Sequence, residues 1–531
     1  MSRAPAMAGA APSGAATASP RPQPGRASIE VNNKGLITIS IMLATVMQVL
    51  DTTIANVALP SMQADLGASA DTINWVLTSY IVAAAIMTPM TGWLADRIGR
   101  KRLFLVSVAG FVVASLACGL AWNLNSMVAF RLLQGVFGAA IVPLSQTFML
   151  DINPPEKQGQ AMALWGAGIM VGPIIGPTLG GWLTESFDWR WVFLINLPVG
   201  IAAFLGCLAT LPEKATVRRY FDLIGFAFIA LGVGSLQLML DRGGEVDWFN
   251  STEVWIELGL AITGFWVAIV HIATAQKPFL EPRMFRDRNF STGLVLIFVI
   301  GVVLLASMAL LPPMLSRIYG YPVITTGLVM APRGVGTMFS MILVGRLVQI
   351  VDPRALIVTG LLLTSWSLYL MTGFSPDMSN RLIIESGIIQ GIGLGLVFVP
   401  LSTVAFATIE PRLRADATAL FSLVRNIGSS IGISVVSFLL TRNVQVNHVE
   451  LSALIVPTAP EVQSMLPVAG RLPGGSALAV LDGMINVQAL MISYLNNFLA
   501  MMWVTLAALP LVFLLRRPKR GGGPAAAAHM D

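Results

Sequence analysis

"LLQGVFGAAIVPLS", residues 132–145, recurs later in the chain as "IIQGIGLGLVFVPLS", residues 388–402. Two shorter repeats accompany this pair in the same order. They are "LPSM" (59–62) with "LPPM" (311–314), and Gly-x-Leu at Gly92 with the same step at Gly345. Three repeats in order, at a nearly constant offset, indicate an internal duplication. The chain is therefore predicted to contain two related halves.

The composition is that of a membrane protein. Of 531 residues, 55% are hydrophobic and 11% charged, with a mean hydropathy of +0.75, whereas a soluble domain carries about 25% charged residues. The net charge of +6 resides in short loops between apolar stretches, a topological pattern that does not indicate nucleic-acid binding. Cys118 and Cys207 lie in apolar stretches and the three histidines are far apart, so we expect no disulfide, metal site or cofactor.

Fourteen stretches are long and apolar enough to cross a bilayer, which requires about 20 residues. They lie near residues 36–60, 73–95, 103–122, 126–149, 160–184, 191–212, 222–241, 254–275, 291–314, 325–348, 355–373, 382–408, 416–440 and 496–515. The repeats pair spans 1, 2 and 4 with spans 9, 10 and 12. The predicted fold is therefore all-α and polytopic, with two six-helix bundles and two inserted helices between them. Paired halves with a site near the midplane are typical of secondary transporters.

The predicted division of the chain follows from these spans. The parts are a disordered N-terminal tail (1–35), a six-helix bundle (36–212), two inserted helices with linkers (213–290), a second six-helix bundle (291–515) and a C-terminal tail (516–531). A long polar segment, 441–495, is predicted as a loop that could hold an amphipathic helix at the membrane surface.

The distribution of Lys and Arg predicts the orientation. Most of the 33 Lys and Arg residues fall on the side of the N-terminus. The exceptions are Arg190, Arg242, Arg317, Arg381, Arg442 and Arg471 on the opposite side, and Arg131, Arg333 and Arg425 within spans. Because cytoplasmic loops are enriched in Lys and Arg, both termini are predicted to be cytoplasmic.

Asp51 is a charged residue inside the first span. It shares one helical face with Gln48, Thr52 and Asn56, at spacings of three, four and eight residues. An ionisable residue inside a membrane is costly and suggests function, here a protonatable group that couples transport to protons. The alternative is a purely structural polar contact between helices.

Arg131 in span 4 is the natural partner of Asp51, although simple extension of its side chain to the interface is an alternative. The positions that correspond to this pair in the second half are near Val303 and Gly387, both uncharged. The charged pair thus belongs to the first half alone. Further residues that could line a substrate cavity are Gln48, Asn56, Gln134, Arg333, Glu385 and Arg425.

Span 5 contains "GIMVGPIIGPTLGG", residues 168–181, with small residues and prolines at helical spacing. Its members are Gly168, Gly172, Pro173, Gly176, Pro177, Gly180 and Gly181. Small residues let helix backbones approach closely in lipid, and proline bends a helix. The run predicts a tight packing seam.

These motifs resemble the major facilitator superfamily, in particular its fourteen-span drug:proton antiporters of the EmrB/QacA type. The resemblance covers about 36–515. "GWLADRIGRKRLF" (92–104) resembles the cytosolic loop motif, with Gly92, Asp96, Arg97, Gly99, Arg100 and Lys101 in place. "LDTTIANVALP" (50–60) is similar to the first-span motif, "RLLQG" (131–135) to the fourth-span motif, and the span 5 run to the antiporter motif. "IGFAFIALGVGSLQLMLDRGGEVDWF" (224–249) is closest to the EmrB branch.

The resemblance implies an inner-membrane antiporter that exports amphipathic compounds by alternating access. Asp51 and Arg131 would couple it to protons, and the cytosolic loop motif would form a gate. It implies a periplasmic membrane-fusion adaptor and an outer-membrane channel as partners. Span 13 lacks the central acidic residue of QacA-type pumps, which favours anionic or neutral substrates over dications. The alternative is a symporter or facilitator for an organic anion or other nutrient. The sequence shows no set of residues typical of an enzyme.

Overall fold

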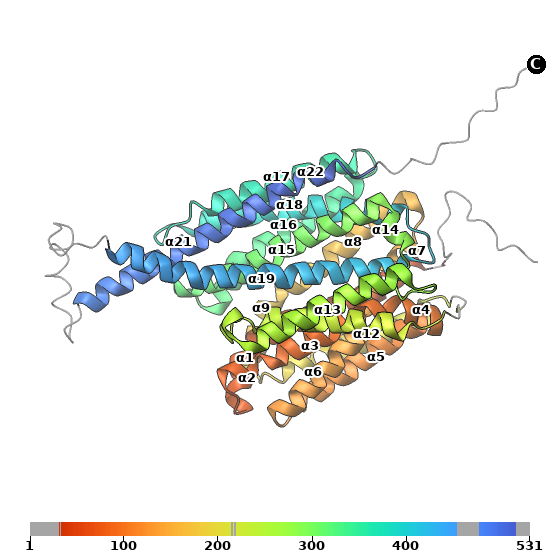
Figure 1. Ribbon diagram of the computed structural model, residues 1–531, viewed down its shortest axis with the longest axis horizontal. Helices are drawn as coiled ribbons and strands as arrows, with labels where there is room; N and C mark the ends of the chain where they lie inside the picture. The colour runs from red at the N-terminus through yellow and green to blue at the C-terminus, as the bar shows by residue number, and fades with distance from the viewer. Residues whose placement is uncertain (1–30, 32, 214–215, 217–218, 454–476, 517–531) are drawn as a thin grey trace, which may run out of the picture.

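The computed structural model describes residues 31, 33–213, 216, 219–453 and 477–516. These residues form helices and connecting segments, with no strand among them. Fourteen helical segments within the described ranges are long and apolar enough to span a membrane (Figure 1). The predicted count of spans and the all-helical fold class are confirmed.

The first half is the red-to-yellow part of Figure 1. Its helices are α1 (Lys34–Asp65), α2 (Ala70–Ile73), α3 (Trp75–Met87), α4 (Thr91–Ile98), α5 (Arg100–Gly119), α6 (Leu124–Gly138), α7 (Ile141–Asp151), α8 (Gln158–Ile169), α9 (Val171–Ser186), α10 (Trp191–Leu194) and α11 (Asn196–Thr210). Spans 2, 4 and 5 are each divided into two helices, close to Pro89, Pro143 and Pro173. Proline has no N–H for the helical hydrogen bond and clashes with the preceding turn, which explains such breaks.

The second half occupies the green-to-blue part of Figure 1. It contains α15 (Arg288–Arg317), α16 (Val323–Leu347), α17 (Pro353–Met371), α18 (Asn380–Ala407), α19 (Arg414–Ala453), α21 (Ala477–Ala507) and α22 (Leu509–Val512). Its packing repeats that of the first half. The pairs α3–α6, α5–α6 and α1–α9 correspond to α16–α18, α17–α18 and α15–α19. This correspondence explains the sequence repeats.

The inserted helices are α12 (Leu223–Arg242) and α13 (Thr252–Thr274), followed by the short α14 (Arg283–Arg286). Their backbones touch, because a Cβ on Gly264 would lie 2.5 Å from the backbone nitrogen of Gly232. The outer face of α13 exposes Trp255, Ile262 and Trp266, as expected of a surface that faces lipid. On its other side, α12 packs against both α3 of the first half and α19 of the second.

The prediction of a long polar loop over 441–495 is wrong at both of its ends. Helix α19 continues to Ala453 and α21 begins at Ala477, and the two project together beyond the rest of the bundle (Figure 1). Polar residues that suggested a loop face each other in this hairpin: Asn447 Nδ2 donates to Ser493 Oγ at 2.9 Å, and His448 Nε2 lies 2.9 Å from an Asp482 carboxylate oxygen. The middle of the predicted loop, and nearly all of the two predicted tails, lie outside the described residues.

The two ends of the bundle carry different parts of the chain. Helix α1 begins and α22 ends at the same end, on the right in Figure 1. The Asn289 side chain at the start of α15 bonds the backbone of Arg516 there. We call this the terminus-bearing end. The α12–α13 connection and the projecting hairpin lie at the opposite end.

Candidate functional site: a buried ion pair and a gate cluster

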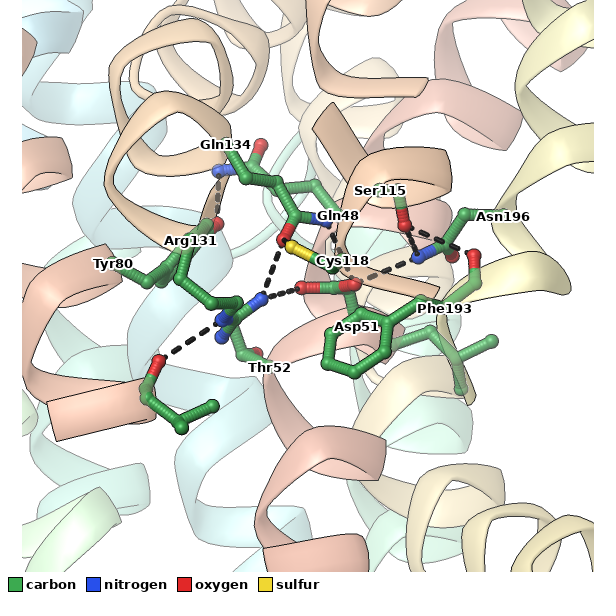
Figure 2. Close-up of polar contacts among 12 residues, drawn as sticks. Gln48, Asp51, Thr52, Tyr80, Ser115, Cys118, Arg131, Gln134, Phe193 and Asn196 are labelled. Atoms are coloured by element: carbon green, nitrogen blue, oxygen red, sulfur yellow. Dashed lines mark hydrogen bonds and ion pairs between the residues drawn. The ribbon is translucent and has the colours of Figure 1, made fainter. Parts of the chain in front are cut away.

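The carboxylate of Asp51 is the centre of a buried polar cluster in the first half (Figure 2). It accepts hydrogen bonds from Arg131 Nη1 at 2.7 Å, Gln134 Nε2 at 3.0 Å and Asn196 Nδ2 at 2.7 Å. The donors come from α6 and α11, so three helices meet at this group. Asp51 and Arg131 are both 0% exposed. The structure therefore brings together the pair that the sequence suggested.

The guanidinium of Arg131 is held from several directions. Its Nε donates to the backbone oxygen of Val76 at 3.0 Å and its Nη1 also donates to Gln134 Oε1 at 2.7 Å. The Tyr80 ring centroid lies 4.4 Å from its central carbon and the Phe193 centroid 5.6 Å. A buried charge is stable only when paired and hydrogen-bonded, and this cluster meets both conditions. Loss of the Asp51 charge would leave the guanidinium without its counter-ion.

Gln48 lies beside this cluster, whereas Asn56 does not join it. Gln48 Nε2 is 3.4 Å from the Tyr80 hydroxyl, and its Oε1 is buried without a partner among the described residues. Asn56 lies further along α1 and is exposed. Thr52 on the same face donates to the backbone oxygen of Val49.

Sequence reasoning missed Asn196 and Ser115. Asn196 Nδ2 donates both to Asp51 and to Ser115 Oγ, the latter at 2.9 Å. Ser115 in turn donates to the backbone oxygen of Phe193 at 2.9 Å, which fixes the amide in place. The available signal was an asparagine within an apolar span, which needs a polar partner in lipid.

A second cluster joins the two halves at the terminus-bearing end. Asp151, at the end of α7, forms ion pairs with Arg100 of the loop motif and with Arg414 at the start of α19, the latter at 2.7 Å. Arg100 Nη2 also donates to the backbone oxygen of Pro411 at 3.0 Å. Nearby, the Thr147 and Thr418 hydroxyls are 2.8 Å apart. These contacts connect the first half directly to the second.

Other residues of the loop motif pack on the start of α19. Gly92 is in such close contact that a Cβ there would lie 1.7 Å from Asp416 Oδ1. Arg219, in the linker before α12, pairs with Asp416 at 2.6 Å and lies 3.6 Å from Asp96. Burial of Arg219 disfavours its charge, but Asp416 outweighs this and raises its pKa above the ordinary value.

The remaining motif residues have structural explanations of their own. Gly99 adopts a φ of +94°, where side chains are strained. The Arg97 guanidinium lies 5.2 Å from the Trp93 ring centroid, while Lys101 is half-buried. Sequence reasoning missed Asp151, Arg414, Arg219 and Asp416, which complete the cluster.

The glycine-rich run of span 5 forms the predicted seam. A Cβ on Gly176 would lie 2.2 Å from Thr53 Oγ1, and one on Gly172 would lie 2.8 Å from Val49 Cγ1, both on α1. Gly180 lies against Ile54, and Gly168 against Met42. The opposite face of α9 meets α16, where a Cβ on Gly334 would lie 2.0 Å from Ile174 Cγ1. Span 5 is thus inserted between α1 and the second half.

Three residues predicted to line a cavity lie in the second half, apart from the Asp51 cluster. Arg333 is buried; its Nη2 donates to Ser307 Oγ at 2.9 Å, while its Nη1 has no partner in the described ranges. The half-buried Arg425 side chain forms no hydrogen bond or ion pair with the described residues either. Glu385 is instead paired with the exposed Arg381, one turn away, at 2.7 Å.

Comparison with known proteins agrees with this architecture. The Major Facilitator Superfamily pattern matches residues 41–433. The chain is 36% identical to the multidrug export protein EmrB of Escherichia coli K12, over 93% of this chain and 98% of that one. It is 37% identical to the fatty acid resistance protein FarB of Neisseria gonorrhoeae, over 92% and 97% of the two chains.

Two solved structures share the fold. The human organic anion transporter MFSD10 aligns with a TM-score of 0.59 and 13% identity, over 90% of this chain and 99% of that one. The proton:xylose symporter XylE aligns with a TM-score of 0.55 and 13% identity, over 86% and 94%. Together with the fourteen spans and the duplicated halves, the sequence matches show that this chain is a multi-pass membrane transporter of the major facilitator superfamily, in its EmrB-type branch.

Proposed function

We propose that this protein is a proton-coupled antiporter that exports amphipathic, largely apolar compounds by alternating access. The observation that carries the proposal is the buried Asp51–Arg131 ion pair, in which a protonatable carboxylate is the counter-ion of a fixed cation. The EmrB relative, named a multidrug export protein, supports export of more than one compound.

The cluster suggests how a proton acts. Protonation of Asp51 would remove the negative charge from the 2.7 Å contact with Arg131 and leave the Asn196 and Gln134 amides facing a neutral group. The Arg131 guanidinium would then lose its counter-ion, and its contacts with Val76 and Tyr80 in α3 would be strained. Because α3 contacts the Asp51 cluster and also packs on α12, the change would reach the boundary between the halves.

The ion-pair cluster around Asp151 serves as the gate in this proposal. It holds the halves together at the terminus-bearing end, which the distribution of Lys and Arg assigns to the cytoplasm. Opening toward the cytoplasm would require separation of Asp151 from Arg414, and closure would restore this ion pair. Span 5, packed between α1 and α16, would be the surface on which the halves rock.

The substrate cavity is proposed to favour anionic or neutral amphipathic compounds. Arg333 retains an unpaired guanidinium nitrogen, and Arg425 has no ion pair among the described residues. Both belong to the second half, which leaves the proton-coupling pair in the first. The relative named a fatty acid resistance protein supports this preference. If dications were the best substrates in a vesicle efflux assay, this part of the proposal would be wrong.

We further propose that the protein lies in a Gram-negative inner membrane and works with a periplasmic membrane-fusion adaptor and an outer-membrane channel. The projecting hairpin of α19 and α21 is at the end opposite the termini (Figure 1), the side on which an adaptor would bind. Crosslinking from cysteines placed at positions 446 and 484 of this hairpin would test it: crosslinks to a periplasmic protein support the arrangement, and reaction with cytoplasmic reagents alone contradicts it.

Proton flux in inverted vesicles tests antiport. With the lumen acidified, addition of a non-ionisable substrate to wild-type vesicles is expected to raise the luminal pH, since protons leave as substrate enters. Asp51→Asn is expected to lose this response while still exchanging labelled for unlabelled substrate. Asp71→Asn, an exposed carboxylate on α2, serves as the matched control and should behave like wild type. Unchanged proton flux in Asp51→Asn would refute the assignment, and flux of the opposite sign would indicate a symporter.

A further inference from the structure

The inserted helix α12 contains an acidic residue that the coupling scheme above does not use. Asp241 lies near the end of α12, at the end of the bundle opposite the termini. There α12 is packed between α3 and α19, one from each half. The apolar residues Met239, Leu240 and Val254 form a small core around this junction, against which Ile431 of α19 packs. Asp241 therefore lies beside a small apolar core at a three-helix boundary.

The carboxyl group of Asp241 has no cationic partner among the described residues. Its Oδ1 accepts a hydrogen bond from Gln237 Nε2 at 2.9 Å, while its Oδ2 is buried and has no hydrogen-bond partner among the described residues. Thr78 of α3 also acts on this carboxyl group as a hydrogen-bond donor, so both of these partners are neutral. A buried carboxylate without a counter-ion is costly, and the group neutralises by taking up a proton. A protonated carboxyl group is neutral, so it needs no cation as a partner.

Asp241 is connected to the second half through Gln237. Gln237 Nε2 lies 2.8 Å from Ser430 Oγ, and Gln237 Oε1 lies 3.1 Å from the same hydroxyl. One turn further along α19, the Ser434 hydroxyl donates to the backbone oxygen of Leu240. The carboxyl group is thus part of a polar contact that joins α12 to α19.

The charged groups near Asp241 do not neutralise it. The neighbouring Arg242 pairs with Glu253 of α13 and lies 5.0 Å from the Trp75 ring centroid of α3. Glu245, in the following loop, has the same sign as Asp241 and accepts from Asn74 at 2.6 Å. Glu257 of α13 is also acidic, and one of its carboxylate oxygens is buried without a hydrogen-bond partner among the described residues.

The helices on either side of α12 do not supply a cation either. From α19, the nearest charged residue in sequence to Ser430 is Arg425, and no ion pair joins it to Asp241 in the described part of the chain. The titratable group of α3 is Tyr80, which lies over Arg131 instead. The acidic groups at this junction therefore outnumber the cations directed at it.

Helix α3 connects this site to the Asp51 cluster. Val76 and Tyr80 contact Arg131, while Trp75 and Thr78, on another face of the same short segment, contact Arg242 and Asp241. A shift of α3 that follows protonation of Asp51 would change the packing of α12 against it. Because the burial of Asp241 depends on this packing, Asp241 would bind or release a proton in the same step of the transport cycle.

We propose that Asp241 is a second proton-binding site, occupied while α12 is packed between α3 and α19, and that its proton is exchanged once in each transport cycle. The coupling part of the proposal rests on the proposed antiport. The binding part does not, because it depends only on the geometry of the carboxyl group. Each part has its own measurement.

Difference infrared spectroscopy of the purified, full-length protein tests proton binding. A carbonyl-stretch band of a protonated carboxyl group is expected at about pH 5, where an ordinary Asp is already ionised, in wild type and in the control Asp71→Asn, and absent in Asp241→Asn. Alkaline titration of wild type should remove the same band, a measurement that needs no variant. A band that Asp241→Asn leaves unchanged would show that Asp241 is ionised, and would overturn the proposal.

The steady-state substrate gradient in proteoliposomes tests coupling, with an imposed gradient of one pH unit and no membrane potential. Loss of one coupled proton in Asp241→Asn is expected to reduce the accumulation ratio about tenfold, while Asp71→Asn leaves it unchanged. An equal ratio in Asp241→Asn and wild type would refute coupling even if the band is lost. If wild type itself shows no proton-dependent accumulation, the antiport proposal fails and coupling fails with it. The infrared result then still decides whether Asp241 holds a proton.

Discussion

The buried pair of Asp51 and Arg131 permits a quantitative test of charge compensation through three variants: Asp51→Ala, Arg131→Met and the double variant. Removal of one partner from a buried ion pair costs about 3–5 kcal/mol. Asp51→Ala should fall in the upper part of this range, because it also removes the acceptor of the Gln134 and Asn196 amides. Arg131 would remain charged at 0% exposure, held by Val76, Gln134 and two aromatic rings.

Arg131→Met should lower the free energy of unfolding less than Asp51→Ala does. In Arg131→Met, Asp51 retains two amide donors and can take up a proton, so we expect a loss of about 2–3 kcal/mol near neutral pH. The loss should shrink on acidification, because protonation removes the unpaired charge. The double variant contains neither charge, and its loss should be about 3 kcal/mol smaller than the sum of the single losses.

Unfolding by SDS in mixed micelles, followed by tryptophan fluorescence, measures these free energies. The coupling energy from the double-mutant cycle is the decisive number. A coupling below about 0.5 kcal/mol would mean that the two sites are independent, and would refute the argument that each charge compensates the other. An Arg131→Met loss that does not change with pH would also contradict it.

Three further predictions concern packing, pH and thiol access. Gly176→Ala should lower the free energy of unfolding by about 1–3 kcal/mol, because α1 must move to admit the methyl group. The control Gly35→Ala should leave the free energy of unfolding unchanged, because nothing lies within 4 Å of its Cβ position. The SDS assay measures both variants. Burial opposes the charge of Asp222, but hydrogen bonds from Gly225, His271 and Phe279 lower its pKa below the ordinary value. The ionised group therefore stabilises the fold above its ordinary pKa, and this contribution is lost as the pH falls through the lowered pKa. Asp222→Asn should lower the free energy of unfolding by about 1–2 kcal/mol at neutral pH and should have no effect below the lowered pKa. The two cysteines, each 0% exposed, should resist maleimide in the native protein and react in SDS, as mass spectrometry would show.

The spans could be predicted from the sequence because the bilayer imposes one simple requirement, a long apolar helix, on each of them. The same criterion failed at 441–453 and 477–495, where polar side chains such as Asn447 and His448 contact a partner helix and not water alone. Composition alone cannot distinguish these two environments. The extended hairpin was therefore predicted as a loop.

The site could be predicted in part for a related reason. Asp51 and Arg131 are recognisable because charges are rare within spans, although their contact depends on a helix register that one sequence does not determine. Asp151 and Arg414 lie at span ends, where charged residues are common, and their pairing joins positions 263 residues apart. Asn196 stands out as an amide within an apolar span, but the sequence does not show which polar group it bonds; in the structure that group is Asp51.

The contact between Gly92 and Asp416 has a practical consequence. Helix α4 can lie this close to α19 only because position 92 has no side chain: a Cβ there would lie 1.7 Å from Asp416 Oδ1 and 2.9 Å from the Asp416 Cα. A single added methyl group at this position would therefore disfavour the arrangement seen here, while Asp51 and Arg131 stay unchanged. If this contact is the proposed gate, Gly92→Ala is expected to favour the conformation open at the terminus-bearing end, which would make that conformation accessible to structure determination.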